Sequence, residues 1–222
     1  MKIFYIILLT LFAFITCNQA SEEGKTLESA EGEKIVPNYM DSVSKKIYRQ
    51  DYNGAIEDCN KIIKLYPKEE GGYAARGSVK MATLDCKGAI VDYTHAIKIN
   101  PNDAMAYRNR SIAKYSLDDK QGALKDMTES MELDPNNATS YTARAQIEIG
   151  LGKEEEAKID LEKSITLFNK NITKDPNNAS LYIGRASAKV LLGSSEGLCE
   201  DLKKTFDLGV SQAIDLMKQY CN

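Results

Sequence analysis

Small and apolar residues recur along this chain at a fixed interval of 34 positions. Around Ala123, such residues follow one another at steps of three and four, which is the spacing of one face of an α-helix. A similar spacing of Tyr107, Ser111 and Lys114 precedes it. Each interval therefore predicts two short helices that run antiparallel. The residues that mark the second helices are 34 positions apart, with a last step of 41: Ala55, Ala89, Ala123, Ala157 and Leu198.

Aromatic residues open the intervals and prolines close them. The aromatic residues are Tyr39, Tyr73, Tyr107, Tyr141 and Tyr182. The prolines are separated by 34, 34 and 41 residues: Pro67, Pro101, Pro135 and Pro176. A proline cannot continue a helix, and an asparagine such as Asn136 or Asn137 can cap the next one. We expect helix-turn-helix units over residues 36–69, 70–103, 104–137, 138–178 and 179–210.

Seven extra residues lengthen the fourth unit. They follow a second helix in which Leu161, Ile165, Phe168 and Ile172 are spaced by four, three and four. Seven residues make two helical turns, so the helix can lengthen without changing the face that it buries. We expect it to reach about Thr173. Residues 211–222 predict a last helix that covers the exposed end of the array.

These features together resemble the tetratricopeptide repeat (TPR). The period, the opening aromatic residue, the small residue of the second helix and the closing proline match it from Val36 to about Leu208. The resemblance implies an all-α, right-handed TPR solenoid of about five repeats, because one helix pair cannot bury its own apolar face. It also implies a protein-binding scaffold rather than an enzyme.

The resemblance places a partner in a concave groove lined by the first helix of each repeat. Family members that bind chaperone tails hold a terminal carboxylate there with Lys and Asn. The matching positions here are Met40, Asp41, Ser44, Ala74, Ala75 and Ser78. They contain neither residue type, so we expect an extended or helical protein segment instead of a clamped carboxylate. The expected binding groove contains Met81, Arg108, Asn109, Ile112, Tyr115, Thr142, Gln146 and Ile149.

Arginine and aspartate also recur, one in each helix of a unit. Each arginine lies three residues after the opening tyrosine, at an edge of the packed faces where its guanidinium can bind a carboxylate through two hydrogen bonds. We interpret the pattern as structural ion pairs rather than a polyanion site. Because the first unit has Asp58 but Ser42 in the arginine position, each aspartate is expected to pair with the arginine of the following unit, which leaves Asp201 unpaired. The expected set is Asp58, Arg76, Asp92, Arg110, Asp126, Arg144, Asp160 and Arg185.

Two of the five cysteines are predicted to form a disulfide. Cys199 and Cys221 are each 11 residues from Val210, the centre of the expected last turn, so they come level in an antiparallel helix hairpin. The ending 209–221 also resembles terminal caps of other bacterial repeat proteins, in which paired cysteines occur. Cys59 and Cys86 are interpreted as buried free thiols.

Composition argues against most other functions. The formal net charge is −3 and no basic block is present, so the surface that nucleic-acid binding requires is missing. The single histidine, His95, cannot form a histidine metal cluster or a Ser-His-Asp triad. No glycine-rich phosphate loop occurs. We therefore expect no catalytic residue, no cofactor, no metal and no nucleic-acid partner.

Residues 1–17 predict a signal peptide. Residues 3–15 form an apolar run that is shorter than the roughly 20 residues of a transmembrane helix. Cys17, which follows this run, resembles the lipidated cysteine of bacterial lipoproteins. Ordinary cleavage after Ala20 and an uncleaved anchor are the alternatives. We expect an exported protein held by an N-terminal lipid on a membrane of the cell envelope, facing the periplasm or the exterior; the alternative is a soluble periplasmic or secreted protein.

Residues 18–35 carry five glutamates against two lysines and few apolar residues, which predicts a flexible acidic tether to the array at 36–222. The array is expected to be monomeric by itself. Two roles fit it: a scaffold of the cell envelope that binds a segment of a partner protein, or a fixed structural or assembly subunit of an envelope complex.

Overall fold

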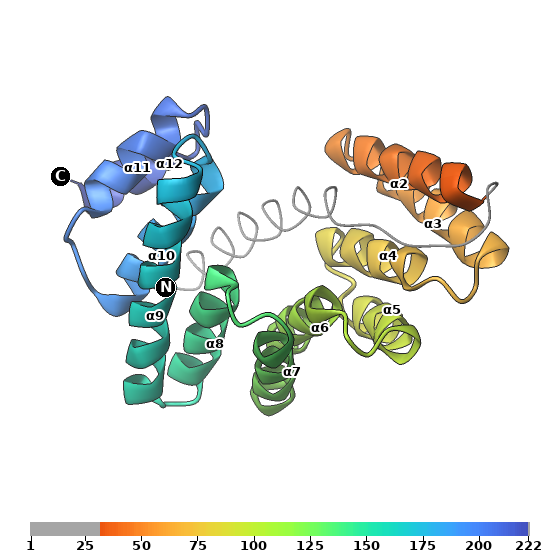
Figure 1. Ribbon diagram of the computed structural model, residues 1–222, viewed down its shortest axis with the longest axis horizontal. Helices are drawn as coiled ribbons and strands as arrows, with labels where there is room; N and C mark the ends of the chain where they lie inside the picture. Colours follow the sequence, from red (N-terminus) through yellow and green to blue (C-terminus); the bar gives the residue numbers. More distant parts are fainter. Residues whose placement is uncertain (1–31, 222) are drawn as a thin grey trace. The chain divides into compact units, whose positions relative to one another are not determined.

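The computed structural model describes residues 32–221, and all regular secondary structure in this range is α-helical (Figure 1). The predicted all-α class is thus confirmed. The described residues form two compact units, of which the first ends at Asp118 and the second begins at Asp119.

The first compact unit is built from stacked helix pairs. Each helix packs against the next one in the chain, and α4 also contacts α2 and α6. Contacts between alternate helices stack one pair on another, which is how a short pair buries the rest of its apolar surface. The described helices are α2 (Gly32–Tyr48), α3 (Tyr52–Leu65), α4 (Glu70–Ala82), α5 (Cys86–Ile99) and α6 (Ala104–Ser116).

The second compact unit continues the pattern and ends in a short cap. Its described helices are α7 (Lys120–Leu133), α8 (Ala138–Gly150), α9 (Glu154–Lys174), α10 (Ala179–Leu192), α11 (Leu198–Asp207) and α12 (Ala213–Tyr220). Helix α9 has 21 residues against 14 in α7, so the seven extra residues add two turns to it, as predicted. The predicted final helix is α12, which packs on α11.

The N-terminal expectation needs one correction. Helix α2 begins at Gly32, so residues 32–35 are helical and do not belong to a flexible tether. Glutamate and lysine have high helix propensity, so a polar composition does not prevent the packed helix from extending through them. The remaining tether, residues 18–31, and the predicted signal peptide with Cys17 lie outside the described residues. From residue 32 onward, no helix is both long and apolar enough to cross a bilayer.

A residue with left-handed backbone lies between the first and second helix of each repeat. These residues have φ angles of 60°, 64°, 64°, 75° and 71°: Gln50, Leu84, Asp118, Gly152 and Gly193. Glycine adopts this conformation without steric cost, whereas another residue loses about 1–2 kcal/mol. The first three turns therefore contain strain that the last two avoid.

An aspartate after this turn explains why a glycine precedes the recurring alanine of the second helix in the first three repeats, as Gly88 precedes Ala89. The Asp85 carboxylate accepts a hydrogen bond of 2.9 Å from the Gly88 backbone N–H and so caps α5. A Cβ atom on Gly88 would lie 2.1 Å from the Asp85 Oδ2 atom, so only glycine fits beneath this cap. In α9, Lys153 replaces the aspartate and makes no side-chain cap, and Glu156 replaces the glycine. The two positions therefore change together.

Two core residues lie opposite each other in each helix pair, one on the first helix and one on the second, and a larger side chain at one position requires a smaller one at the other. A Cβ atom on Gly77 of α4 would lie 2.9 Å from the ring of Tyr93, which is fully buried in α5. The equivalent pairs are Val43 with Cys59 in the first repeat and Ala145 with Leu161 in the fourth, and each pair lies in one core cluster. Tyr93, the largest side chain of the three second helices, lies opposite glycine, whereas the smaller Leu161 and Cys59 lie opposite alanine and valine.

The left-handed turn makes a prediction about stability. Leu84 is 82% exposed and has φ of 64°, so its side chain buries little while its backbone is strained. We expect Leu84→Gly to raise the free energy of unfolding by about 0.5–1 kcal/mol, measured by urea denaturation, because relief of strain exceeds the added entropy of the unfolded chain.

The matched control for this change is Gly152→Ala in the fourth turn. It should lower the free energy of unfolding by about 1 kcal/mol, because it introduces the same strain. Stability changes of the same sign in the two variants would contradict this account of the turns.

Candidate partner-binding surface and its supporting ion pairs

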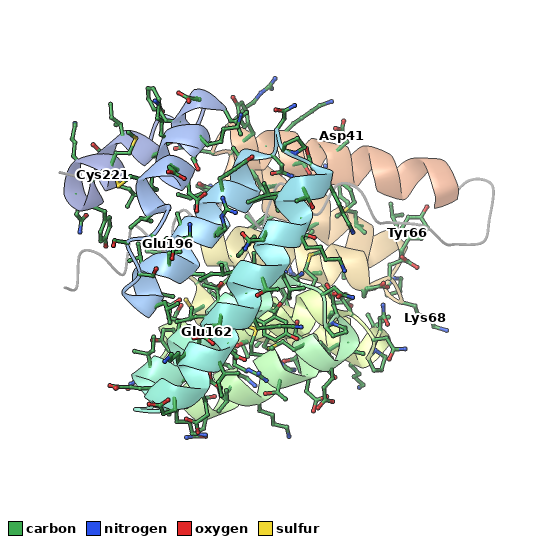
Figure 2. The ribbon with its side chains drawn as sticks, turned by 60° about the vertical axis from the view of Figure 1, so that its left-hand side comes forward. Asp41, Tyr66, Lys68, Glu162, Glu196 and Cys221 are labelled. Carbon is green, nitrogen blue, oxygen red and sulfur yellow. A yellow bond between two sulfur atoms is a disulfide. The ribbon has the colours of Figure 1, made fainter. Side chains whose placement is uncertain are left out.

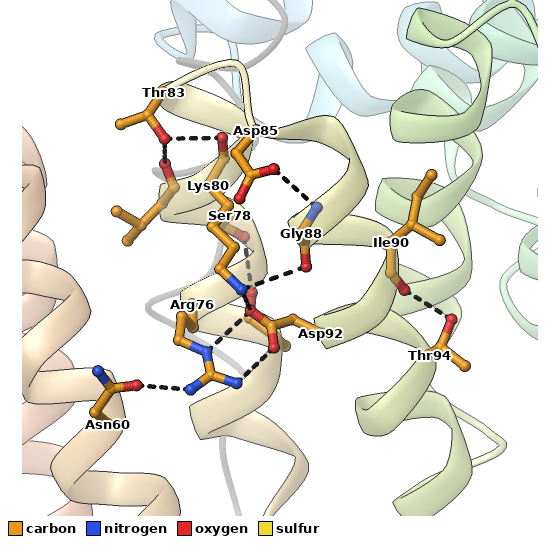
Figure 3. A network of polar contacts seen from close by, with 12 residues as sticks. Asn60, Arg76, Ser78, Lys80, Thr83, Asp85, Gly88, Ile90, Asp92 and Thr94 are labelled. Carbon is orange, nitrogen blue, oxygen red and sulfur yellow. Dashed lines mark hydrogen bonds and ion pairs between the residues drawn. The ribbon is translucent and has the colours of Figure 1, made fainter.

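Arginine and aspartate pair within a repeat through two hydrogen bonds. In the second repeat, Arg76 Nε donates to Asp92 Oδ2 at 3.0 Å and Arg76 Nη2 donates to Asp92 Oδ1 at 2.6 Å (Figure 3). In the fourth repeat, the corresponding distances from Arg144 to Asp160 are 2.6 and 2.8 Å. Arg185 and Asp201 pair in the same way in the fifth repeat. All three aspartates are buried.

The predicted pairing of each aspartate with the following repeat is therefore wrong. Each of these aspartates pairs with the arginine that lies 16 residues before it. Asp201 is paired, contrary to the expectation. Asp58, whose repeat has no arginine, accepts hydrogen bonds from Ser42 Oγ at 2.7 Å and Lys46 Nζ at 2.6 Å. Ser42 replaces the arginine by donating directly to the same carboxylate.

The remaining arginine nitrogen links a repeat to the helix before it. Arg76 Nη1 donates to Asn60 Oδ1 of α3 at 2.6 Å, and Arg185 Nη1 donates to Asn169 Oδ1 of α9 at 2.5 Å. Arg110 Nη1 donates to Thr94 Oγ1 of α5 at 3.1 Å. Each acceptor lies 16 residues before its arginine. A polar residue thus recurs 16 positions before these arginines, and this recurrence was the sequence signal that could have predicted the link. Asp126, the last member of the predicted set, is buried.

A lysine completes the cluster in several repeats, and the sequence prediction omitted it. Lys80 Nζ lies 2.8 Å from Asp92 Oδ2, and Lys189 Nζ lies 2.9 Å from Asp201 Oδ2. The lysine stands four residues after the arginine position: Lys46, Lys80, Lys114 and Lys189. The fourth repeat has Glu148 there.

Hydrogen bonds within these clusters favour the charged forms of Asp58 and Arg76. Burial alone would raise the pKa of Asp58, but hydrogen bonds from Lys46, Ser42 and Lys61 outweigh it and lower this pKa to about 2. The hydrogen bonds to Asp92 raise the pKa of Arg76. Arg76 also lies over the ring of Tyr73, with 5.8 Å from its Cζ atom to the ring centroid. These arginines are engaged within the protein, which favours the structural interpretation over a polyanion site.

The predicted groove residues differ in exposure, and two of them are covered. Arg108 is 3% exposed and Thr142 is 2% exposed. Thr142 Oγ1 is 2.7 Å from Ser164 Oγ of α9, which itself donates to the backbone carbonyl of Ala138 at 2.8 Å. This internal hydroxyl pair explains why Thr142 does not face solvent. The prediction that Arg108 and Thr142 offer hydrogen bonds to a partner is therefore wrong.

The other groove residues have accessible side chains. In the first compact unit, Met81 on α4 and three residues on α6 are half-buried. In the second compact unit, Gln146 on α8 is half-buried and Ile149 is 37% exposed. The α6 residues are Asn109, Ile112 and Tyr115. These surfaces are mainly apolar with amide groups beside them.

The cysteines divide into one disulfide and two thiols. Cys199 of α11 and Cys221, which follows α12, form a disulfide with an S–S distance of 2.13 Å, at the C-terminal end in Figure 2. A closed loop of this length is worth about 3 kcal/mol. Cys59 is a buried thiol whose pKa is raised to about 12 by burial, so it is not nucleophilic. Cys86 is a half-buried thiol at the first position of α5.

The remaining titratable groups form no metal centre. No three side chains of His, Cys, Asp or Glu lie close enough to bind a metal ion in the part of the chain that the structure describes. His95 is exposed and stacks on Tyr73, with ring centroids 5.3 Å apart.

A family model described as tetratricopeptide repeat matches residues 138–171, which form α8 and most of α9. None of the curated proteins matches this sequence. No enzymatic family is indicated.

Solved structures of helical-repeat proteins share the fold. TTC0263, a thermophilic TPR protein in Thermus thermophilus, matches with a TM-score of 0.64 and 14% identity over 83% of this chain and 96% of that chain. MamA matches with a TM-score of 0.53 and 21% identity over 77% of this chain and 96% of that chain. The first TPR of Spaghetti (RPAP3), bound to the HSP90 peptide SRMEEVD, matches with a TM-score of 0.52 and 23% identity, over 58% of this chain and 99% of that chain.

The ion pairs make a prediction about stability. We expect Arg76→Met to lower the free energy of unfolding by about 3 kcal/mol, because buried Asp92 keeps only Lys80 as a cationic partner. Urea denaturation measures the change.

Lys61→Met is the matched control, because Lys61 pairs with an aspartate from an exposed position. It should cost less than about 1 kcal/mol. The double variant Arg76→Met with Asp92→Leu should recover part of the loss, since no charge is then left buried. Equal losses in Arg76→Met and Lys61→Met would contradict a structural role for the pair.

Proposed function

We propose that this chain, a tetratricopeptide-repeat protein, is a non-catalytic scaffold that binds a segment of another protein on the first helices of its repeats. One observation carries the proposal. The arginines and aspartates that recur from repeat to repeat are engaged in internal pairs, as Arg76 is with Asp92, whereas the accessible first-helix residues differ between repeats. Met81, Ile112 and Ile149 are examples of the second kind. Residues that do not repeat are available for specific recognition.

The chemistry of the first compact unit favours an apolar segment over an acidic one. The first TPR of Spaghetti (RPAP3) binds the HSP90 peptide SRMEEVD, which supports peptide binding by this fold. In the present chain, however, Asp41 is exposed on α2 and pairs with Lys45 at 2.6 Å, so this lysine already has a carboxylate partner. Ser78 Oγ already donates to the carbonyl of Ala74 at 3.1 Å and lies 3.1 Å from Tyr93 Oη. We therefore propose that the partner segment binds through apolar side chains and that its binding does not require a C-terminal carboxylate.

A pair of isoleucines in the fourth repeat tests this function. Ile149 lies on first helix α8 at 37% exposure, and Ile159 lies on second helix α9 at 66% exposure. A photoreactive phenylalanine analogue at position 149 should crosslink in cells to one protein, which mass spectrometry identifies. Ile149→Glu should then reduce recovery of that protein at least tenfold, because a buried charge is costly at an apolar contact.

Ile159→Glu is the control for this experiment. It should leave recovery of the partner unchanged, and both variants should keep the thermal midpoint of the wild type because both side chains are exposed. An adduct from position 159 alone would place binding on the second helices and contradict the proposal. A partner that stays bound at fixed stoichiometry through solubilisation would favour a fixed structural subunit instead.

We also propose that the protein is exported and anchored to a membrane through lipid on Cys17. The apolar run at residues 3–15 and the cysteine that follows it support this proposal. Cys17→Ser should move the protein from the membrane fraction to the soluble fraction or leave it unprocessed, which immunoblotting of the fractions and the mass of the mature chain measure.

Cys86→Ser is the control, because it removes a cysteine within the folded array. Normal processing and unchanged membrane fractionation of Cys17→Ser would contradict lipidation.

A further inference from the structure

The fourth repeat breaks the rule that a lysine supports the Arg–Asp pair. In the other repeats, the lysine lies 12 residues before the aspartate, as in Lys46 with Asp58 at 2.6 Å and Lys189 with Asp201 at 2.9 Å. The same position of the fourth repeat is Glu148, which is 12 residues before Asp160. A carboxyl group has thus replaced an ammonium group beside a buried aspartate.

Glu148 is enclosed and only weakly paired. It is 7% exposed, and its Oε2 atom is buried with no hydrogen-bond partner. Its Oε1 atom lies 3.8 Å from Arg144 Nε, whereas the same nitrogen donates to Asp160 Oδ2 at 2.6 Å. The guanidinium of Arg144 therefore lies near two carboxyl groups, but it donates its hydrogen bonds to Asp160 and not to Glu148. An ionised Glu148 would carry a buried charge without an adequate partner.

Besides Arg144, one other cation acts on this carboxyl group, and its effect is smaller than that of either acid of α9. Helix α9 contributes Asp160 and Glu156, and the turn between α8 and α9 contributes Lys153, which opposes them. On α10, Arg185 and Lys189 both bind Asp201. The buried charged residue of α7 is Asp126, an acid.

We infer that Glu148 is a proton-binding site built into the fourth repeat, where the neutral carboxyl group stabilises the α8–α9 pair and its ionisation weakens that pair. Burial is the main reason that the pKa of Glu148 rises, and the charge of Asp160 adds to it against the opposing effect of Arg144; together they raise this pKa from 4.5 to about 7. Protonation and ionisation of the site are therefore balanced near neutral pH.

The sign of the pH effect follows from the direction of this change in pKa. The folded state holds the proton more tightly than the unfolded state, so the site contributes its full stabilisation below pH 4.5. That stabilisation is lost as the pH rises from 4.5 to about 7. Between these limits the unfolding equilibrium constant should rise on the order of a hundredfold, because the proton affinities of the two states differ by about that factor. Asp58 behaves oppositely, because its lowered pKa stabilises the fold above pH 3.8.

Hydrogen–deuterium exchange of the full chain tests the inference. Exchange of peptides from residues 138–174 is compared between the wild type and Glu148→Gln at each pH from 5 to 9, which cancels the intrinsic pH dependence of exchange. The ratio of wild-type to variant exchange rates should rise from near one at pH 5 to the order of a hundred at pH 8. Glu148→Lys, which restores the lysine of the other repeats, should also remove the pH dependence.

Glu162→Gln serves as the matched control, because Glu162 is an exposed glutamate on α9 (Figure 2). Its exchange should follow the wild type at every pH. Should Glu148→Gln fold poorly, Glu148→Met provides the neutral side chain for the same comparison. A ratio that stays constant from pH 5 to 9, or the same change in Glu162→Gln, would overturn the inference.

Discussion

Close contact between the two helices of a repeat is the constraint on which the rest of the structure depends. The alanines of the second helices are fully buried, for example Ala55 and Ala89, because a single methyl group lets the helix backbones approach. The remaining space is divided between the facing positions, so that Tyr93 leaves room for only a hydrogen atom on Gly77. Such a pair is too small to bury both of its faces, and stacking on the next pair completes its core.

The same closeness determines where charged groups can lie. An arginine on one helix reaches an aspartate on the next, and its remaining nitrogen reaches back to the preceding helix, as Arg76 does with Asp92 and Asn60. One side chain therefore links three helices. Breaking such a link leaves a buried carboxylate, so the cost exceeds the value of an exposed ion pair. The repeats are held in register by these links in addition to apolar burial.

The period of the sequence was sufficient to predict the helices, the long α9 and the cap at the end. It left open which arginine pairs with which aspartate in most repeats, because Asp92 lies 16 residues after Arg76 and 18 residues before Arg110. The insertion in the fourth repeat was the available signal, since it keeps the step of 16 from each arginine to the following aspartate but widens the other step to 25. The geometry of the helix pair confirms the step of 16. The burial of Thr142 could not be predicted from the repeat pattern either, since it depends on a contact of its hydroxyl group with Ser164 of the neighbouring helix. Glu148, by contrast, was visible as the single acid in a series of lysines.

The fourth repeat differs from its neighbours at Lys153, Glu156 and Glu148, and together these differences place acidic groups close to one another. Lys153 removes the aspartate cap of α9, which permits Glu156 where a capped helix requires glycine. Three glutamates in the first turn then stabilise the positive end of the helix dipole by charge instead of by a hydrogen bond. The same substitution brings the charge of Glu156 near Glu148, where it further disfavours ionisation. Because stability in a repeat array is the sum of local terms, a pair stabilised by charges responds to pH and salt more than a pair stabilised by caps. We therefore expect a change of pH near neutrality to act on this array mainly at the α8–α9 pair.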